Sequence, residues 1–283
     1  MAYKTPAEVS RAAVASGVAK AALRTDKVLV SSFLAGAYIA FGGLVAISTT
    51  AGLKPAQWGS LPTLITGATF SLGLILVIIA GSDLLTGNMA LVTIAALRRK
   101  VTFARLLTNF GLVTVGNLIG ALVVAYFLAY KTGVIPGHHV GGILYERIAA
   151  IAKGKAVTET HTQQFLRAIG CNWLVCLAVW IALAAEDVAG KILGIFFPIL
   201  AFVAIGFDHV VANMFFLPLA MFAHVPGITG ANVIENLIFA FLGNLVGAAV
   251  FVAGAYYYLY LQGEPDNVVA KTEAAAALEG SRF

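Results

Sequence analysis

Residues 81–89 read Gly-Ser-Asp-Leu-Leu-Thr-Gly-Asn-Met, and residues 206–214 read Gly-Phe-Asp-His-Val-Val-Ala-Asn-Met. The two stretches share the pattern G-x-D-x4-N-M at an offset of 125 residues, and each lies in a long run with no other charged residue. A second pattern, N-x6-G-N-L-x-G, begins at Asn109 and again at Asn236, at an offset of 127 residues. The nearly equal offsets indicate that one unit of chain is used twice.

The composition indicates the solvent in which these units fold. Of the 283 residues, 60% are apolar and only 11% are charged, whereas a soluble domain has about 45–50% and about 25%. Residues 28–53, 106–130 and 236–263 contain no Asp, Glu, Lys or Arg. A bilayer core is spanned by roughly 20 apolar residues, so the chain is predicted to be a polytopic membrane protein. A disordered chain, a soluble enzyme and a secreted disulfide scaffold are excluded, and the net charge of +5 requires no nucleic-acid partner.

Six membrane spans are predicted. The second and fifth have 37 and 33 residues, enough for helices of about 55 and 50 Å in a hydrocarbon core of ~30 Å. Because each carries one acidic residue close to a glycine, both are expected to be helices broken at mid-depth. Three spans per copy make an inverted repeat, with copies at about 28–130 and 165–261 and the substrate path near their interface. The spans are residues 28–50, 61–97, 106–130, 165–186, 190–222 and 232–261.

The basic residues predict the orientation. Twelve Lys and Arg side chains lie on the side of the two termini, and the other side has Lys54 and four more within residues 131–164. The positive-inside rule then places both termini in the cytoplasm, for a multi-pass protein of a prokaryotic cytoplasmic (inner) membrane. Residues 1–27 are expected to form an amphipathic helix along that surface, and residues 262–283 a short cytoplasmic tail.

The two repeated motifs, together with C-N-W-L-V-C-L-A-V-W at residues 171–180, resemble the formate–nitrite transporter family over about residues 28–260. The resemblance implies an all-α, aquaporin-like plan and a homopentamer in which each protomer has its own pore. It implies no cofactor, and small monovalent anions as substrates. Formate is placed first, then nitrite and hydrosulfide, with acetate or lactate carried by some members. Small residues that permit close helix packing also favour an oligomer; they are Gly36, Gly116, Gly120, Gly243 and Gly247.

His209 is the main candidate for chemistry. An ionisable side chain within a span is a functional candidate by default, and histidine can change its charge near neutral pH. The alternative is a core histidine bonded to a carbonyl, but the first copy has Leu84 at the matching position. In the family, the central pore histidine stands here. The resemblance also assigns Thr86 as a contact of substrate and His209, and Asn172 as a donor on the pore wall.

The two acidic residues of the breaks have a structural interpretation. Asp83 and Asp208 come shortly after a glycine and can cap the next half-helix, which we favour over a proton relay. The family usually has glutamate where Asp208 stands. Asn88 and Asn213 are expected to tie the loops to the helices.

The resemblance also assigns the walls and the entrance of the path. Lys155 is taken as the lysine at the outer entrance, although it lies one residue further from Asn172 than in the family. Lys153 is held in reserve, and a solvated surface lysine is the alternative. The apolar constriction is assigned to Phe70, Leu74, Leu84 and Phe202.

Together these residues predict proton-coupled transport. A charged anion at mid-membrane loses its hydration at great cost, but a lysine and positive helix N-termini can attract it. Desolvation raises the pKa of the anion, so it can take a proton and cross the constriction as the neutral acid. Two other classes of protein are the alternatives. A membrane enzyme would rely on His138, His139 and His161, which lack a well-spaced carboxylate, and a neutral-solute channel would need N-P-A-type loops.

Overall fold

The computed structural model describes residues 3–264 and is helical throughout its ordered elements. Six helices of this part are long and apolar enough to cross a membrane, which confirms the predicted number of spans. Of the expected tail, residues 265–283 lie outside the described residues. The spanning elements are α2 (Thr25–Thr50), α4 (Leu61–Ile79), α6 (Phe103–Val123) with η1 (Val124–Lys131), α8 (His161–Ala184), α9 (Val188–Ile205), and α11 (Gly230–Ala248) with η3 (Ala249–Gly254) and α12 (Ala255–Tyr260).

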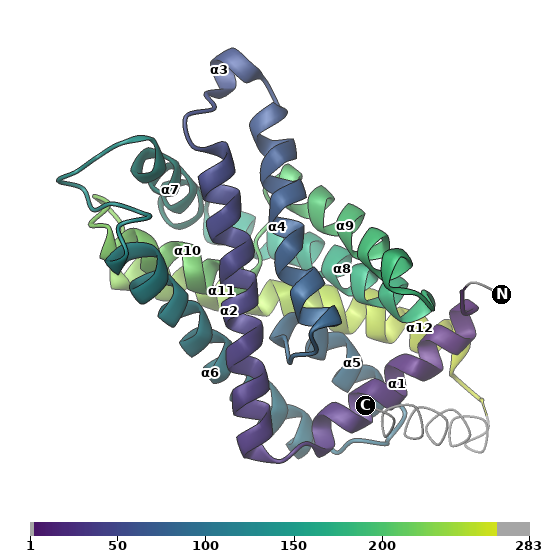
Figure 1. Cartoon of the computed structure of the whole chain (residues 1–283). Coiled ribbons are helices and arrows are strands. Elements are labelled where there is room, and N and C mark those ends of the chain that lie inside the picture. The colour runs from purple at the N-terminus through teal and green to yellow at the C-terminus, as the bar shows by residue number, and fades with distance from the viewer. Residues whose placement is uncertain (1–2, 265–283) are drawn as a thin grey trace.

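Two shorter apolar helices follow α4 and α9. Helix α5 (Leu85–Leu97) and helix α10 (Val210–Phe222) have 13 residues each, which makes them about 20 Å long. The chain is non-helical at residues 80–84 and 206–209, immediately before them. In α10 every side chain from Val210 to Ala220 is buried, so this helix lies in the interior of the bundle (Figure 1). Both short helices therefore begin inside the protein.

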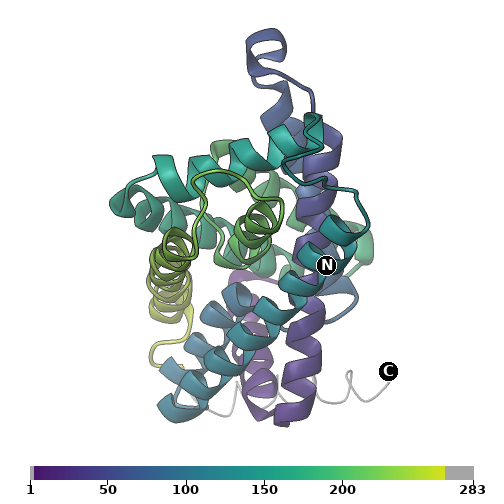
Figure 2. The ribbon, with the colours of Figure 1, turned by 90° about the vertical axis from the view of Figure 1, so that its left-hand side faces the viewer.

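Two further helices pack around these short ones. Helix α1 (Pro6–Ala22) starts with a capping box between Thr5 and Glu8 and buries Val9, Ala13 and Val14 in the contact that α1 makes with α5. Helix α7 (Ile143–Lys153), followed by η2 (Gly154–Thr158), contacts α10 in a similar way. The short α3 (Pro55–Trp58) lies at the tip of the α2–α4 connection, which projects beyond the bundle (Figure 2).

Glycines bring two pairs of helices into backbone contact. A Cβ placed on Gly120 of α6 would lie 2.0 Å from the carbonyl oxygen of Phe33 in α2. In the other half, a Cβ on Gly247 of α11 would lie 2.3 Å from the oxygen of Ile169 in α8. No side chain fits at either contact. The glycines that favoured an oligomer thus act within one chain, and they are no evidence for a subunit interface.

We expect Gly120→Ala to destabilise the protein by about 1–3 kcal/mol, because the new methyl group must push two helix backbones apart. The measurement is the midpoint of thermal unfolding in detergent. Gly111→Ala is the matched control, since Gly111 lies on the same helix and an added Cβ would meet no atom of the described structure within 4 Å. Equal midpoints for the two variants would contradict this account of the α2–α6 contact.

Candidate functional site

The side chain of His209 lies where the two non-helical breaks meet. It is the N-cap residue of α10, and its Nδ1 accepts a hydrogen bond of 3.1 Å from the backbone N–H of Ala212. A ring nitrogen that accepts carries no proton, so the proton of the neutral ring is on Nε2. Nε2 lies 2.9 Å from Oγ1 of Thr86, in the first turn of α5. The imidazole therefore donates to the threonine, and the threonine hydroxyl hydrogen remains available for another acceptor.

The first N–H of each short helix is bound by an asparagine, not by an aspartate. Leu85 N donates to Oδ1 of Asn117 at 2.9 Å, and Val210 N donates to Oδ1 of Asn244 at 2.8 Å. The prediction that Asp83 caps α5 is therefore wrong, and so is the prediction that Asp208 caps α10. Asn117 and Asn244 come from the repeated G-N-L pattern of α6 and α11, whose amides reach the breaks because the neighbouring glycines allow close approach.

Each aspartate instead binds a lysine. Asp83 accepts from Nζ of Lys20 at 2.7 Å and from Asn88 at 3.2 Å. Asp208 accepts from Nζ of Lys155 at 2.7 Å and from Asn213 at 2.9 Å. Asn88 and Asn213 also bond to asparagines of α6 and α11, so they do link the breaks to neighbouring helices.

Sequence reasoning missed Lys20, which it treated as one of several surface charges. The lysines precede their aspartates by 63 and 53 residues, respectively, so a fixed offset does not relate them. The signal in the sequence that could have identified Lys20 was its position on α1. Lys20 lies on the α1 turn that carries Val18 and Ala21 against the core.

Asn172 is buried but does not line the cavity beside His209. Its Nδ2 donates to the carbonyl oxygen of Thr86 at 3.2 Å and to that of Asn244 at 2.8 Å. Both amide hydrogens are therefore used on backbone. In this arrangement Asn172 of α8 holds the Thr86 peptide in place, which differs from the expected role as a donor on the pore wall.

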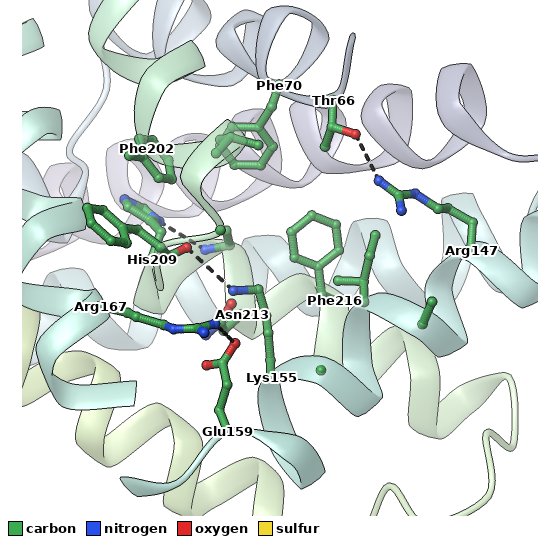
Figure 3. Close-up of a pocket in the computed structure, with 17 residues that line it drawn as sticks. Thr66, Phe70, Arg147, Lys155, Glu159, Arg167, Phe202, His209, Asn213 and Phe216 are labelled. Atoms are coloured by element: carbon green, nitrogen blue, oxygen red, sulfur yellow. Dashed lines mark hydrogen bonds and ion pairs between the residues drawn. The ribbon is translucent and has the colours of Figure 1, made fainter. Parts of the chain in front are cut away.

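A cavity of about 250 Å³ opens beside His209 (Figure 3). Its wall includes Phe70 of α4 and Phe202 of α9, whose ring centroids lie 6.0 Å apart, edge to face. Phe202 also stacks on the His209 ring at 6.0 Å. Phe216 of α10, which the sequence did not single out, stacks on Phe70 at 6.3 Å. The other two constriction candidates, Leu74 and Leu84, are buried outside the cavity lining.

Lysine and arginine side chains on the cavity wall form ion pairs with two carboxylates. Lys155 pairs with Asp208. Arg167 pairs with Glu159 (Figure 3). Oε2 of Glu159 and Oδ2 of Asp208 are both buried and have no hydrogen-bond partner among the described residues. Burial and a neighbouring negative charge both disfavour the ionised form of a carboxyl group. Burial, followed by Asp208, raises the pKa of Glu159 to about 8.

An all-helical bundle with six apolar spans, and with a charged cavity beside the buried start of α10, is typical of a membrane channel or transporter. The family model described as formate/nitrite transporter matches residues 7–258. An uncharacterized transporter, YrhG, of Bacillus subtilis is 48% identical over 92% of this chain and 95% of its own. A probable formate transporter of Methanothermobacter thermautotrophicus is 46% identical over 92% and 98%. A solved pentameric formate channel with formate bound superposes with a TM-score of 0.73, at 30% identity over 84% and 98%.

This chain belongs to the formate/nitrite transporter family. Members of the family are transmembrane transporters and channels, not enzymes. The resemblance seen in the sequence motifs is thereby confirmed.

Glu159 is expected to carry a proton at pH 7 and to lose it as the pH rises through about 8. Below that pH, the four side chains of Lys155, Arg167, Asp208 and Glu159 together carry one net positive charge. Above it, their charges sum to zero. Infrared spectroscopy of the purified protein should show a protonated carboxyl band that disappears near this pH.

The band should be absent from Glu159→Gln. It should persist in Glu186→Gln, which makes the same change at an exposed glutamate. A band that persists in Glu159→Gln would show that the proton is held elsewhere.

Proposed function

We propose that this protein is a formate channel whose pathway passes His209 and Thr86. The hydrogen bond of 2.9 Å between these side chains carries the proposal, because it joins an ionisable ring on the wall of an aromatic cavity to a buried hydroxyl group next to that wall. The name of the 46%-identical relative, a probable formate transporter, supports formate as the anion.

The chain is further proposed to be an inverted repeat in which two membrane helices are broken at mid-depth. Matching hydrogen bonds support this interpretation. Asn117 donates to the backbone carbonyl oxygen of Asp83 at 3.0 Å, and Asn244 donates to the backbone carbonyl oxygen of Asp208 at 2.8 Å. The excess of basic residues beside the termini supports an orientation with both termini in the cytoplasm. We assign the protein to a prokaryotic inner membrane.

Passage of formate requires two steps that involve its charge: the anion must be attracted into the cavity, and it must then be neutralised. Cationic side chains first attract the anion into the cavity, where Lys155 is the proposed entrance lysine and the exposed Lys153 is not required. Beyond it, the buried rings of Phe70 and Phe202 provide no replacement for water, so the charged form is strongly disfavoured. Desolvation raises the pKa of the carboxylate, and the acid that forms can cross the apolar segment as a neutral molecule together with its proton.

The bonds of His209 suit it to hold this proton. Its Nδ1 is occupied by the Ala212 N–H, so a proton can be given or taken only through Nε2. That nitrogen faces Thr86, whose hydroxyl can donate to one oxygen of the substrate. Leu74 and Leu84 complete the proposed apolar segment from positions just outside the cavity.

His209→Asn is expected to fold, because asparagine is a good N-cap and can accept the Ala212 bond. It loses the Nε2 proton, so formate uptake by proteoliposomes should no longer increase when the outside is made acidic. The measurement is the initial rate at two pH values, with His161→Asn, at an exposed histidine, as the control. An unchanged pH dependence in the folded His209→Asn protein would overturn the proposed role, and preferential uptake of nitrite would overturn the assigned anion.

A homopentamer with one pathway per protomer is the proposed assembly, on the basis of the pentameric structure that this chain resembles. Because the cavity is built from helices of a single chain, each protomer should conduct by itself. Chemical cross-linking in mild detergent should give a ladder of bands that ends at five subunits. A ladder that ends at two or three would refute the pentamer without affecting the pathway.

A further inference from the structure

Three cationic side chains line the described part of the cavity, and they differ in how their charge is balanced. Lys155 lies 2.7 Å from Asp208, and Arg167 is paired with Glu159. Arg147, on α7, forms no ion pair with any described residue. Figure 3 shows it on the opposite side of the cavity from Arg167 and Glu159. Among these three side chains, Arg147 is therefore the one with no carboxyl group bound to it among the described residues.

Two threonines fix the Arg147 side chain. Its Nε donates to Oγ1 of Thr50 at 2.9 Å, and its Nη2 donates to Oγ1 of Thr66 at 2.8 Å. A guanidinium has five N–H donors, so three remain, including both on Nη1. Burial alone lowers the pKa of Arg147, with no acidic group among the causes, although an arginine stays charged in proteins.

The position of Arg147 suits a first contact for a ligand. It is half-buried, whereas His209 is only 2% exposed, so the arginine lies at the end of the cavity nearer to solvent. Thr50 is the last residue of α2, at the end away from the N-terminus. By the proposed orientation this is the outer end of the pathway.

We propose that the guanidinium of Arg147 is an anion-binding site at the cavity mouth, for a small monovalent carboxylate or a planar oxyanion of similar size. The proposal rests on the proposed transport function and adds Arg147, which was not among the residues of the proposed pathway. A guanidinium binds a carboxylate through two parallel hydrogen bonds. The volume of about 250 Å³ is below the ~300–1,000 Å³ usual for drug-sized ligands, which favours a ligand of a few atoms.

Lys155 and Arg167 are less available to an incoming anion, because each is already bound to a carboxyl group. An anion that binds Lys155 must compete with Asp208, which is completely buried beside it. Arg147 offers its charge with no such competition. An uncompensated charge in a cleft can raise the local concentration of an anion about 10-fold or more.

Arg147→Gln is therefore expected to raise the formate concentration for half-maximal uptake roughly tenfold, with little change in the saturated rate. The assay is initial formate uptake by proteoliposomes across a range of formate concentrations. Arg147→Lys keeps the positive charge but lacks the two parallel donors of a guanidinium. Its half-maximal formate concentration should lie between those of wild type and Arg147→Gln. Lys153→Gln is the matched control, because it removes the same charge from an exposed position on the same helix.

A second readout separates this inference from the proposed function. Sodium formate should raise the thermal unfolding midpoint of the purified wild type more than sodium gluconate does, and Arg147→Gln should abolish the difference. If wild type shows this stabilisation but no formate uptake, the proposed function fails and the site stands. If Arg147→Gln matches Lys153→Gln in both assays, the site is refuted while formate transport by wild type still stands.

Discussion

Two helices that begin inside a membrane protein expose backbone N–H groups where no water can bind them. An unsatisfied buried group costs roughly 1–3 kcal/mol, and the hydrocarbon layer offers no replacement. Asn117 and Asn244 meet this constraint, each accepting from the first N–H of a short helix and donating to the carbonyl before it. The amides reach the breaks because Gly120 and Gly247 let their helices pack backbone to backbone. The positions of Thr86 and His209 follow from these bonds.

The same constraint explains why charges occur at the breaks. Asp83 and Asp208 are 3% and 0% exposed, and an isolated carboxylate there would be very costly. Each is balanced by one lysine and one asparagine. These lysines come from α1 and from the η2 segment after α7, so elements outside the spans complete the interior. Helix α1 is therefore part of the buried framework, and not only a surface helix.

How much the sequence predicted depended on whether a feature is local. The six spans followed from charge-free runs, and the pairing of His209 with Thr86 followed from the resemblance of the two motifs to the family. The capping of the breaks was assigned to Asp83 and Asp208 because local spacing favours an adjacent acid. The actual partners come from helices more than thirty residues away, at separations of 32 and 34 residues. Local propensity cannot rank such partners, and it could not find Lys20 for the same reason.

Arg147 illustrates a second limit of sequence reasoning. By composition it was one of several basic residues in the 131–164 segment, where charge serves mainly to predict orientation. What distinguishes it is the absence of a carboxylate among its described neighbours, and the presence of two threonines that use only part of its donors. Whether a charged side chain has a partner of opposite charge depends on its neighbours in three dimensions. The cavity contains cations with a carboxyl partner and one, Arg147, without such a partner among the described residues. Lys155 is bound to the carboxylate of Asp208 at a break, whereas the guanidinium of Arg147 is bound to hydroxyl groups and has donors left over. In the proposed mechanism, this difference lets the cavity be stable when empty and still attract a charged substrate.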